Sequence, residues 1–331
     1  MQKNYGVKFV SFGGALPSKI VKNTDLEKLY ETSDEWIYTR TGIRERRIVS
    51  GDESGLSLST QAANEALKNA EIDAKDIDLI IVSTTTPDKL YPSMSCMLQG
   101  KIGAVKAVSF DLSAACSGFV FGIVTAAQFI YNGQFNNILV VGVDIHSRFL
   151  DWSERSISVL FGDGAGATVI KSCMPKDDEL LGFIIGSEPD NALDLTLDNK
   201  NIYFDNFEKE IKPDFVQMNG RAIYQFALRV VPRAVIDLLD KINLKTSDIN
   251  YFIPHQANQR IIDSTAEKIG FTKSQIISNI DKVGNTSAAS IPLAIADGLK
   301  DKKILTPSTL MLVGFGAGLT WGAAVIHLHF K

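Results

Sequence analysis

The stretch AVSFDLSAACSGFVF at residues 107–121 decides the fold class. Its first part is apolar and β-branched up to Asp111, which predicts a buried strand, and its last part predicts a long apolar helix. Cys116 lies between them, at the start of the helix and among small residues that leave space around its thiol. Unpaired N–H groups and the helix dipole favour a thiolate there, so we expect a nucleophile. The alternative is a small buried cysteine that only fills space.

Strands and helices alternate around this stretch. Strands are expected at 8–11, 77–82 and 137–142, and an amphipathic helix at 57–69. Ser33 predicts the N-cap of a second helix, and Asn23 or Thr24 that of an earlier one. The basic segment 40–47 indicates a solvated surface turn. The fold class is therefore α/β, with helices packed on a sheet.

The second half of the chain repeats this order. A helix is expected at 223–239, a strand at 248–253, a helix from about Gln259 and a strand at 310–314. Asp76 matches Asp248, and Gly142 matches Gly314, both at an offset of 172 in the numbering. The string SAAC at 113–116 matches SAAS at 287–290 at an offset of 174. Three matches in order predict a duplicated α/β unit.

The connector at about 175–212 is rich in Asp and Asn and less periodic, so it is the expected boundary. Residues 1–174 would form an N-terminal half that carries the nucleophilic cysteine. Residues 175–331 would form the connector and the C-terminal half.

Composition excludes several classes of protein. The 331 residues are 45% hydrophobic and 22% charged with a net charge of −4, so a nucleic-acid partner is not expected. No stretch has the length of a membrane span and no leader is visible, which predicts a cytoplasmic protein without membrane association. The three cysteines have no paired spacing, so neither disulfides nor a cysteine zinc site are expected.

The four histidines differ in their surroundings. His255, in PHQAN at 254–258, follows a buried strand at the end where α/β sheets place ligand-handling groups, although a structural histidine is the alternative. His146 also follows a strand and could be a loop residue of either kind. His327 and His329 share one face of the last strand, but without a third ligand no metal site is expected.

Three further strings carry glycine or small polar residues. Asn285 precedes a small-residue helix in GNTSAAS at 284–290, where it could also be only an N-cap. GFGAG at 314–318 could aim backbone N–H groups at an oxyanion, or form only a tight turn. GDGAGA at 162–167 precedes a strand instead of following one, so we reject it as a nucleotide-binding fingerprint.

Taken together, the motifs closely resemble those of β-ketoacyl-[acyl-carrier-protein] synthase III, the initiating condensing enzyme of bacterial-type fatty acid synthesis. The resemblance runs nearly end to end and rests on TSDEWI (32–37), RTGIRER (40–46), AACSGF (114–119), FGDGAGA (161–167), PHQAN (254–258), GNTSAAS (284–290) and TWG (320–322). It implies a thiolase-like, duplicated five-layer α-β-α-β-α fold. It also implies a catalytic triad of Cys116, His255 and Asn285, with an oxyanion hole formed by the N–H groups of Cys116 and Ala317.

The activity implied is the decarboxylative condensation of an acyl-CoA primer with malonyl-[acyl-carrier-protein]. The products are 3-oxoacyl-[acyl-carrier-protein], CoA and carbon dioxide; acyl-CoA is a substrate, and no cofactor or metal is expected. The expected partners are the acyl carrier protein and a second copy of the chain in a homodimer. A related acyl-CoA-primed synthase or acyltransferase of secondary metabolism is the first alternative.

Two other classes fit less well. A thiolase would need a second catalytic cysteine in 314–318, and none is present there. A non-catalytic acyl-binding scaffold would be expected to lose a member of the triad, and none is lost.

The resemblance also implies binding residues. Trp36 and Arg155 would sandwich the CoA adenine, Arg40 would meet its phosphates, and Asn258 and Gly220 would line the pantetheine tunnel. The tunnel or acyl pocket would be bordered by Phe161, Met218, Tyr224 and Tyr91 of the partner subunit. Carrier-protein docking would fall to Arg221, Arg260 and Lys268, which could equally be ordinary solvated charges.

Overall fold

The computed structural model describes residues 4–198 and 214–329, and two sheets form its framework. The first sheet has the order β1 (Gly6–Ala15), β7 (Gly164–Cys173), β6 (Asn137–Asp144), β4 (Leu79–Ser83), β5 (Val108–Leu112). The second sheet has the order β11 (Tyr251–Pro254), β12 (Ser308–Gly316), β13 (Thr320–Leu328), β8 (Leu180–Ser187). In each sheet, therefore, strands from distant parts of the sequence are neighbours.

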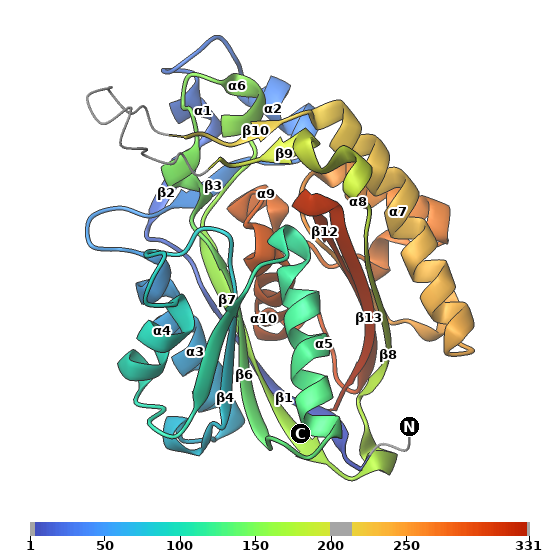
Figure 1. The fold of residues 1–331 in the computed structure, drawn as a ribbon. Coiled ribbons are helices and arrows are strands. Elements are labelled where there is room, and N and C mark those ends of the chain that lie inside the picture. Colours follow the sequence, from blue (N-terminus) through green and yellow to red (C-terminus); the bar gives the residue numbers. More distant parts are fainter. Residues whose placement is uncertain (1–3, 199–213, 330–331) are drawn as a thin grey trace.

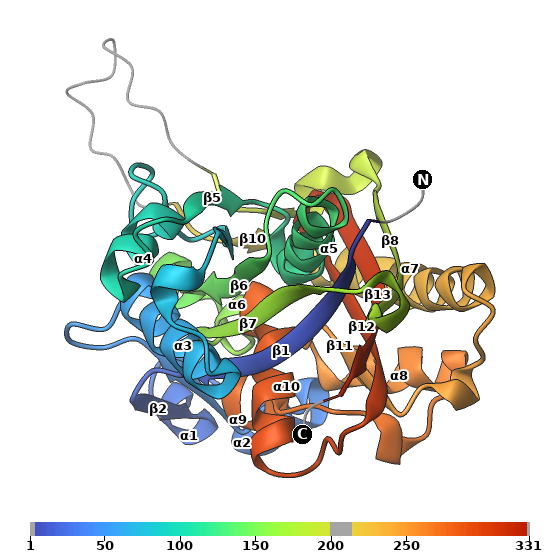
Figure 2. The same ribbon diagram turned by 90° about the horizontal axis from the view of Figure 1, so that it is seen from below.

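Helices alternate with the two sheets to make five layers (Figures 1 and 2). Between the sheets lie α5 (Gly118–Tyr131) and α10 (Ser290–Lys300), whose apolar side chains share one core with strands of both sheets. The outer faces are covered by α3 (Gly55–Ala70) and α4 (Met94–Ile102) on the first sheet, and by α7 (Gly220–Lys241) and α8 (Gln259–Ile269) on the second. Because α5 contacts sheets on both sides, it is apolar almost all round. The arrangement is the α-β-α-β-α fold implied by the resemblance.

The two halves correspond element by element. In the first half β4 pairs in parallel with β5 and β6; in the second half β11 pairs in parallel with β12 and, through one bridge, with Ile276. α5 begins at Gly118 and α10 at Ser290, which is the offset that also relates Gly142 to Gly314. Ala115 and Ser287 are related by the same offset, and both have left-handed φ values, 46° and 51°. The duplication predicted from the sequence is thus visible in the strand order and in the turns.

The offset of 174 predicted for SAAC and SAAS is wrong. The structural repeat keeps the offset of the other matches at this turn, so Cys116 corresponds to Ala288 and not to Ser290. Runs of small residues match one another in more than one register, which is why the strings alone misplace the alignment by two positions.

The connector between the halves contains more structure than expected. β7, the last strand of the first sheet along the chain, ends at Cys173, and β8 of the second sheet begins at Leu180, inside the predicted connector. Residues 199–213 of the connector lie outside the described part of the chain. Among the described helices, none is both long and apolar enough to cross a membrane.

Shorter elements gather beyond one end of the two sheets, at the top of Figure 1. They are β2 (Lys19–Lys22), α1 (Asn23–Leu26), α2 (Asp34–Thr41), β3 (Glu45–Ile48), α6 (Arg155–Ser158), β9 (Leu195–Thr196), β10 (Gln217–Met218) and α9 (Ile280–Val283). The turn after β5 and the loop after β11 lie at this same end, which is the carboxyl end of the parallel strands. Ligands of α/β sheets bind at that end.

Two local predictions in this region have different outcomes. Ser33 is the N-cap of α2, and its Oγ accepts from Trp36 N–H at 3.1 Å, as predicted. Asn23, however, lies inside α1, because its Oδ1 is used to accept from the Arg46 guanidinium at 2.9 Å. The basic segment 40–47 is therefore not simply a solvated turn: Arg46, in β3, has no exposed surface.

Candidate active site

Cys116 lies in one turn of 3-10 helix, Ala115–Ser117, between β5 and α5. The turn packs closely against β12: an added Cβ at Gly316 would lie 2.8 Å from Cys116 N, and one at Gly314 would lie 2.7 Å from Ser117 Cα. Glycine at both positions permits this approach. Only 7% of Cys116 is exposed, so the thiol is reached through a cavity and not from the open surface.

The surroundings of the thiol set its protonation. Burial raises the pKa of Cys116 to about 12; Ser287 Oγ, which donates to Sγ at 3.2 Å, opposes the rise, and the Asp144 carboxylate adds to it. The thiol is therefore protonated in the free protein at neutral pH. The prediction that the helix start favours a thiolate does not hold for this resting site, because burial removes the hydration that a thiolate needs.

His255 follows β11 at the predicted place and is 2% exposed. Its Nδ1 lies 2.8 Å from Ser290 Oγ, and its ring stands edge-on to Phe315 with the centroids 5.1 Å apart. Burial lowers the pKa of His255 to about 3, so the ring is neutral at physiological pH. With Nδ1 occupied, Nε2 is the nitrogen left to act on a ligand in the cavity.

Asn285 is held from both sides by the backbone. Its N–H donates to Leu160 O at 2.8 Å, and its carbonyl accepts from Gly162 N–H at 3.0 Å. The side-chain Oδ1 accepts from Ser287 N–H at 2.9 Å. Because a backbone N–H can only donate, this contact fixes which way the amide points. The capping alternative therefore accounts for Oδ1 only, and Nδ2 remains as a donor for the cavity.

Thr320 joins the Cys116 turn to the turn that carries Ala317. Its Oγ1 lies 3.1 Å from Ala114 O and 3.0 Å from Ala317 O, and it accepts from Ser117 Oγ at 2.9 Å. The two N–H groups expected to form the oxyanion hole thus belong to turns that one side chain holds together. Preorganised donors of this kind cost no rearrangement when charge develops.

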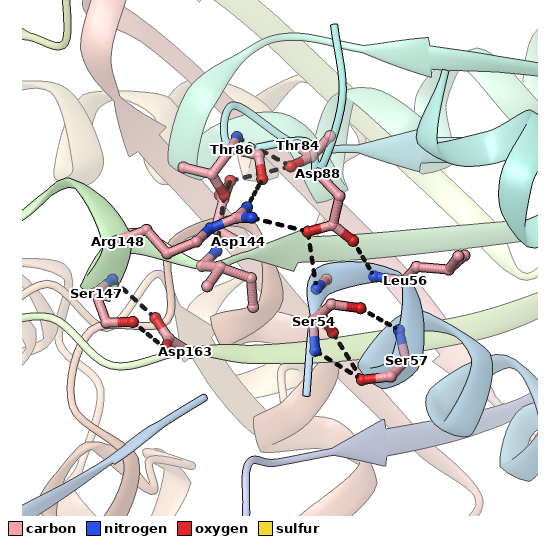
Figure 3. Close-up of polar contacts among 12 residues, drawn as sticks. Ser54, Leu56, Ser57, Thr84, Thr86, Asp88, Asp144, Ser147, Arg148 and Asp163 are labelled. Atoms are coloured by element: carbon pink, nitrogen blue, oxygen red, sulfur yellow. Dashed lines mark hydrogen bonds and ion pairs between the residues drawn. The ribbon is translucent and has the colours of Figure 1, made fainter. Parts of the chain in front are cut away.

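A buried carboxylate, that of Asp144, lies near the same centre, and Figure 3 shows its contacts with Thr84 and Thr86. Asp144 ends β6 and is fully buried. Its Oδ1 accepts from Thr84 Oγ1 at 3.2 Å, from Thr85 N–H at 2.8 Å and from Thr86 Oγ1 at 2.9 Å, while Oδ2 accepts from Ala288 N–H at 3.2 Å. These bonds tie the end of the first sheet to the turn that follows Asn285.

Four residues of the site were not predicted from the sequence: Asp144, Thr320, Ser287 and Ser290. The last three lie within strings that the resemblance used, but no role was derived for them. Asp144 had a usable signal, because an ionisable residue that ends a fully apolar strand needs a partner.

Of two glycine-rich strings, one differs from its prediction and the other agrees with it. β12 continues to Gly316, so the turn expected at 314–318 begins only at Ala317 and is made by Gly318, with φ of 123°. GDGAGA at 162–167 lies largely within the antiparallel strand β7 and does not open a helix, as its rejection as a nucleotide motif requires.

One cavity of about 260 Å³ is lined by all three expected catalytic residues, Cys116, His255 and Asn285. The same cavity is lined by seven residues expected to bind CoA or to border the acyl pocket: Trp36, Arg40, Phe161, Met218, Gly220, Tyr224 and Asn258. Asn258 also connects two of its walls, because it caps α8 and its Nδ2 donates to Arg40 O at 3.0 Å. Residues that are far apart in the sequence therefore meet in one cavity.

Arg155 is placed beside this cavity. Its guanidinium lies 4.4 Å over the Trp36 ring, as does that of Arg40, and its Nη1 donates to Glu31 O at 2.7 Å. An adenine ring stacked between Trp36 and Arg155 would have to lie where the Arg155 guanidinium now contacts the Trp36 ring. The sandwich implied by the resemblance therefore requires Arg155 to move.

Five further expected residues do not line this cavity, and one of them is Ala317, whose N–H was expected in the oxyanion hole. Tyr91 is 86% exposed. Arg221, Arg260 and Lys268 are exposed, and two of them already donate to backbone carbonyls, Arg260 at 3.0 Å and Lys268 at 3.1 Å. The structure thus places the three cations on the surface without assigning them a partner.

The described residues contain no group of three side chains that could hold a metal ion. The ring centroids of His327 and His329 lie 6.4 Å apart, and His327 Nδ1 is within 3.1 Å of Thr309 Oγ1.

Comparisons with known proteins agree with the fold. The family model described as 3-oxoacyl-[acyl-carrier-protein] synthase III matches residues 110–189, and the model of its C-terminal part matches residues 239–328. A β-ketoacyl-[acyl-carrier-protein] synthase III of Trichormus variabilis is 45% identical over 98% of both chains. The crystal structure of 3-oxoacyl-[acyl-carrier-protein] synthase III from Aquifex aeolicus has a TM-score of 0.90 and 39% identity, covering 97% of this chain and 100% of the other.

The priming β-ketosynthase of the R1128 polyketide pathway is also similar, with a TM-score of 0.93 and 30% identity over 99% of this chain and 98% of its own. Its lower identity makes the secondary-metabolism alternative the less favoured one. Fold and family define a thiolase-like condensing enzyme, which is an acyltransferase. Within that class, the chain belongs to the β-ketoacyl-[acyl-carrier-protein] synthase III family.

Proposed function

We propose that the protein condenses acetyl-CoA, or another short or branched acyl-CoA primer, with malonyl-[acyl-carrier-protein] and so initiates fatty acid synthesis. The products are 3-oxoacyl-[acyl-carrier-protein], CoA and carbon dioxide. The observation that carries the proposal is the single cavity lined by Cys116, His255 and Asn285, which come from three separate segments of the chain.

In the loading half-reaction Cys116 Sγ attacks the thioester carbon of the primer. The bond from this carbon to the CoA sulfur breaks, and CoA leaves as a thiol with the proton that Cys116 gives up. Backbone N–H groups of Cys116 and Ala317 stabilise the intermediate oxyanion. The hydrogen bond from Ser287 Oγ to Sγ supports the negative charge that develops on sulfur.

In the condensing half-reaction His255 Nε2 and Asn285 Nδ2 donate to the thioester oxygen of malonyl-[acyl-carrier-protein]. The bond to the departing carbon dioxide breaks, and its electron pair forms an enolate that these donors stabilise. The enolate carbon attacks the acyl group on Cys116, whose sulfur leaves and regains a proton from solvent. This role needs the Nε2–H tautomer, in which Ser290 Oγ gives its hydrogen to Nδ1 instead of to Ser287 O, which lies 2.8 Å away.

The proposal also assigns binding sites for CoA and for the acyl carrier protein. Trp36, Arg40 and a displaced Arg155 take the nucleotide of CoA, and Asn258 and Gly220 border its pantetheine arm. The exposed cations Arg221, Arg260 and Lys268 meet the acyl carrier protein. No cofactor takes part, because the triad and the two substrates balance the reaction.

A homodimer through β5 completes the proposal. β5 is the edge strand of the first sheet, and Val108 on it is 54% exposed. Leu90 and Tyr91, which precede α4, are 77% and 86% exposed, which supports a partner on this face. We place the enzyme in the cytoplasm, where Cys96, Cys116 and Cys173 would remain free thiols.

The experiment that tests the proposal compares the natural protein with Cys116→Ala by intact-protein mass spectrometry after mixing with acetyl-CoA. We expect one acetyl adduct per chain on the natural protein and none on the variant. Addition of malonyl-[acyl-carrier-protein] should then remove the adduct and release carbon dioxide. A stoichiometric adduct on Cys116→Ala would show that the nucleophile is wrongly assigned.

A further inference from the structure

A second cavity adjoins Cys116, with a volume of about 320 Å³. Cys116, Ala317 and Ser287 line it on the side of the catalytic centre. Apolar side chains, among them Phe161 and Leu197, line other parts. Because both cavities include Cys116, an acyl group on Sγ can extend into this second one. Its lining therefore bears on which acyl groups the enzyme accepts.

One lining residue, His146, is polar and lacks a hydrogen bond. His146 is 8% exposed, and among the described residues its Nδ1 is buried without a partner. The ring is stacked on Phe161, with the centroids 4.8 Å apart and the planes 17° apart. Its backbone is fixed as well, because the next residue, Ser147, donates its N–H to Asp163 at 3.0 Å (Figure 3). Stacking and the neighbouring backbone therefore hold the ring in place, without a hydrogen bond at Nδ1.

The tautomer of His146 follows from the cost of burial. A neutral imidazole has one N–H and one bare nitrogen. An unpaired buried donor is costlier than an unpaired lone pair, since unpaired buried N–H groups are the rarer case in proteins. The bare nitrogen is therefore Nδ1, and Nε2 carries the hydrogen. His146 thus offers a hydrogen-bond donor to the cavity that it lines.

The other polar groups of the cavity narrow the class of ligand. Thr85 Oγ1 is hydrogen-bonded to Asp144, and Ser287 Oγ to Cys116. Ser113 and Thr196 also line the cavity, and their hydroxyl groups are neutral. No lysine or arginine is among the described residues that line the cavity, so a carboxylate there would lack a cation. The ligand group that fits is a neutral oxygen, a hydroxyl or a carbonyl.

The geometry points to a primer whose short acyl chain carries a neutral oxygen beyond the thioester, which accepts a hydrogen bond from His146. This inference rests on the proposed function, because it concerns the acyl group that Cys116 receives. His146 is then a specificity-determining residue for the loading step. A site with a buried donor discriminates against an apolar analogue, which leaves that donor unpaired.

Isosteric thioesters test the inference on the complete protein. The pairs are 3-hydroxybutyryl-CoA, as both enantiomers, with 3-methylbutyryl-CoA, and 4-hydroxypentanoyl-CoA with 4-methylpentanoyl-CoA. Each pair exchanges a hydroxyl for a methyl group of similar size. The measured quantity is the ratio of the hydroxy to the methyl loading rate, from adduct formation on Cys116 by mass spectrometry. We expect a ratio above one in at least one pair.

Two variants connect that ratio with His146. His146→Phe keeps an aromatic ring beside Phe161 and removes the donor, so the ratio should fall by about 3- to 10-fold, the value of a neutral hydrogen bond. His146→Gln keeps a donor and should retain more of the ratio. Each ratio is internal to one variant, so differences in overall activity cancel.

The inference is overturned if the natural protein prefers the methyl member of both pairs, or if His146→Phe leaves the ratio unchanged. Loading of acetyl-CoA on the natural protein separates this failure from that of the proposed function. If acetyl-CoA loads while the ratios are below one, only the inference fails. If no thioester loads Cys116, both fail.

Discussion

At the scale of single residues, burial keeps both Cys116 and His255 neutral. The pKa of Cys116 is raised to about 12 and that of His255 is lowered to about 3, in each case mainly by burial. A resting thiolate–imidazolium pair, as in cysteine hydrolases, is therefore disfavoured. His255 is better suited to donate a hydrogen bond than to remove the thiol proton.

Alkylation of Cys116 tests this protonation state. With iodoacetamide the rate should be low at pH 7.5 and should keep rising between pH 9 and pH 11, because the thiolate is the reactive form and the thiol pKa is about 12. Peptide mass spectrometry locates the label, with Cys116→Ala as the background. A rate that levels off near pH 8 would contradict the raised pKa of the Cys116 thiol.

At the scale of elements, buried polar contacts join strands that the sequence separates. Glu179, just before β8, accepts from Phe9 N–H of β1 at 2.7 Å through its side chain. Its own N–H donates to Val7 O at 2.7 Å, and its carbonyl accepts from His327 N–H at 2.8 Å. Burial raises the pKa of Glu179 to about 7, against the effect of the Phe9 N–H.

Glu179→Gln should therefore stabilise the protein at pH 8 more than at pH 4.5. The folded pKa lies above the unfolded value, so the folded state binds the additional proton between about pH 4.5 and pH 7, and stability contributed by this group is lost as the pH rises through that range. Urea unfolding at both pH values measures the difference, which should be about 1–3 kcal/mol.

Glu188→Gln is the matched control for that prediction. Its hydrogen bonds with Arg229, at 2.6 and 2.9 Å, lower the pKa of Glu188 below its usual value. Removal of this charge should destabilise the protein at pH 8, the opposite sign. Equal effects of the two substitutions would contradict the account of Glu179.

The elements themselves were largely predictable. β12 and α8 were expected from apolar periodicity, and α8 begins at Gln259, where Asn258 caps it. Apolar periodicity predicts which face of one segment is buried. Capping residues and glycines predict where a helix begins or the chain turns. The fold class follows from these local signals and from the repeat.

Contacts between distant segments were not predictable in the same way. Arg46 appeared to be part of a surface turn, but its guanidinium donates to Val159 O, 113 residues away, at 2.9 Å. Thr320 joins two turns that are distant in the sequence, with separations of 203 and 206 residues to Ser117 and Ala114. The contacts of such side chains depend on tertiary packing, which local sequence patterns do not predict. The resemblance supplied the triad, whereas His146 emerged only from the lining of a cavity.

At the scale of the whole molecule, the free edge of β5 predicts a dimer. Light scattering at micromolar concentration should give the mass of two chains. Val108→Asp places a charge on the exposed edge and should shift the protein toward monomers, whereas Ile236→Asp, at a 45% exposed position on α7, should not. A monomer for the natural protein, or equal effects of the two substitutions, would contradict this interface.

The duplication itself has a functional consequence. The first half contributes Cys116, and the second half contributes His255 and Asn285, all to one cavity. The two halves would then divide the chemistry, since the first receives the acyl group and the second stabilises the enolate. An interaction made only with the enolate should affect only the condensing step.

Measurement of both half-reactions on His255→Ala and Asn285→Ala tests this division most directly. Acyl-enzyme formation from acetyl-CoA is followed by intact mass, and carbon dioxide release from malonyl-[acyl-carrier-protein] is followed on the same samples. Loading should persist, while decarboxylation should fall by roughly 10²–10³, the usual cost of losing one oxyanion donor. Slow loading with intact decarboxylation would contradict the account and would make His255 the base that deprotonates Cys116.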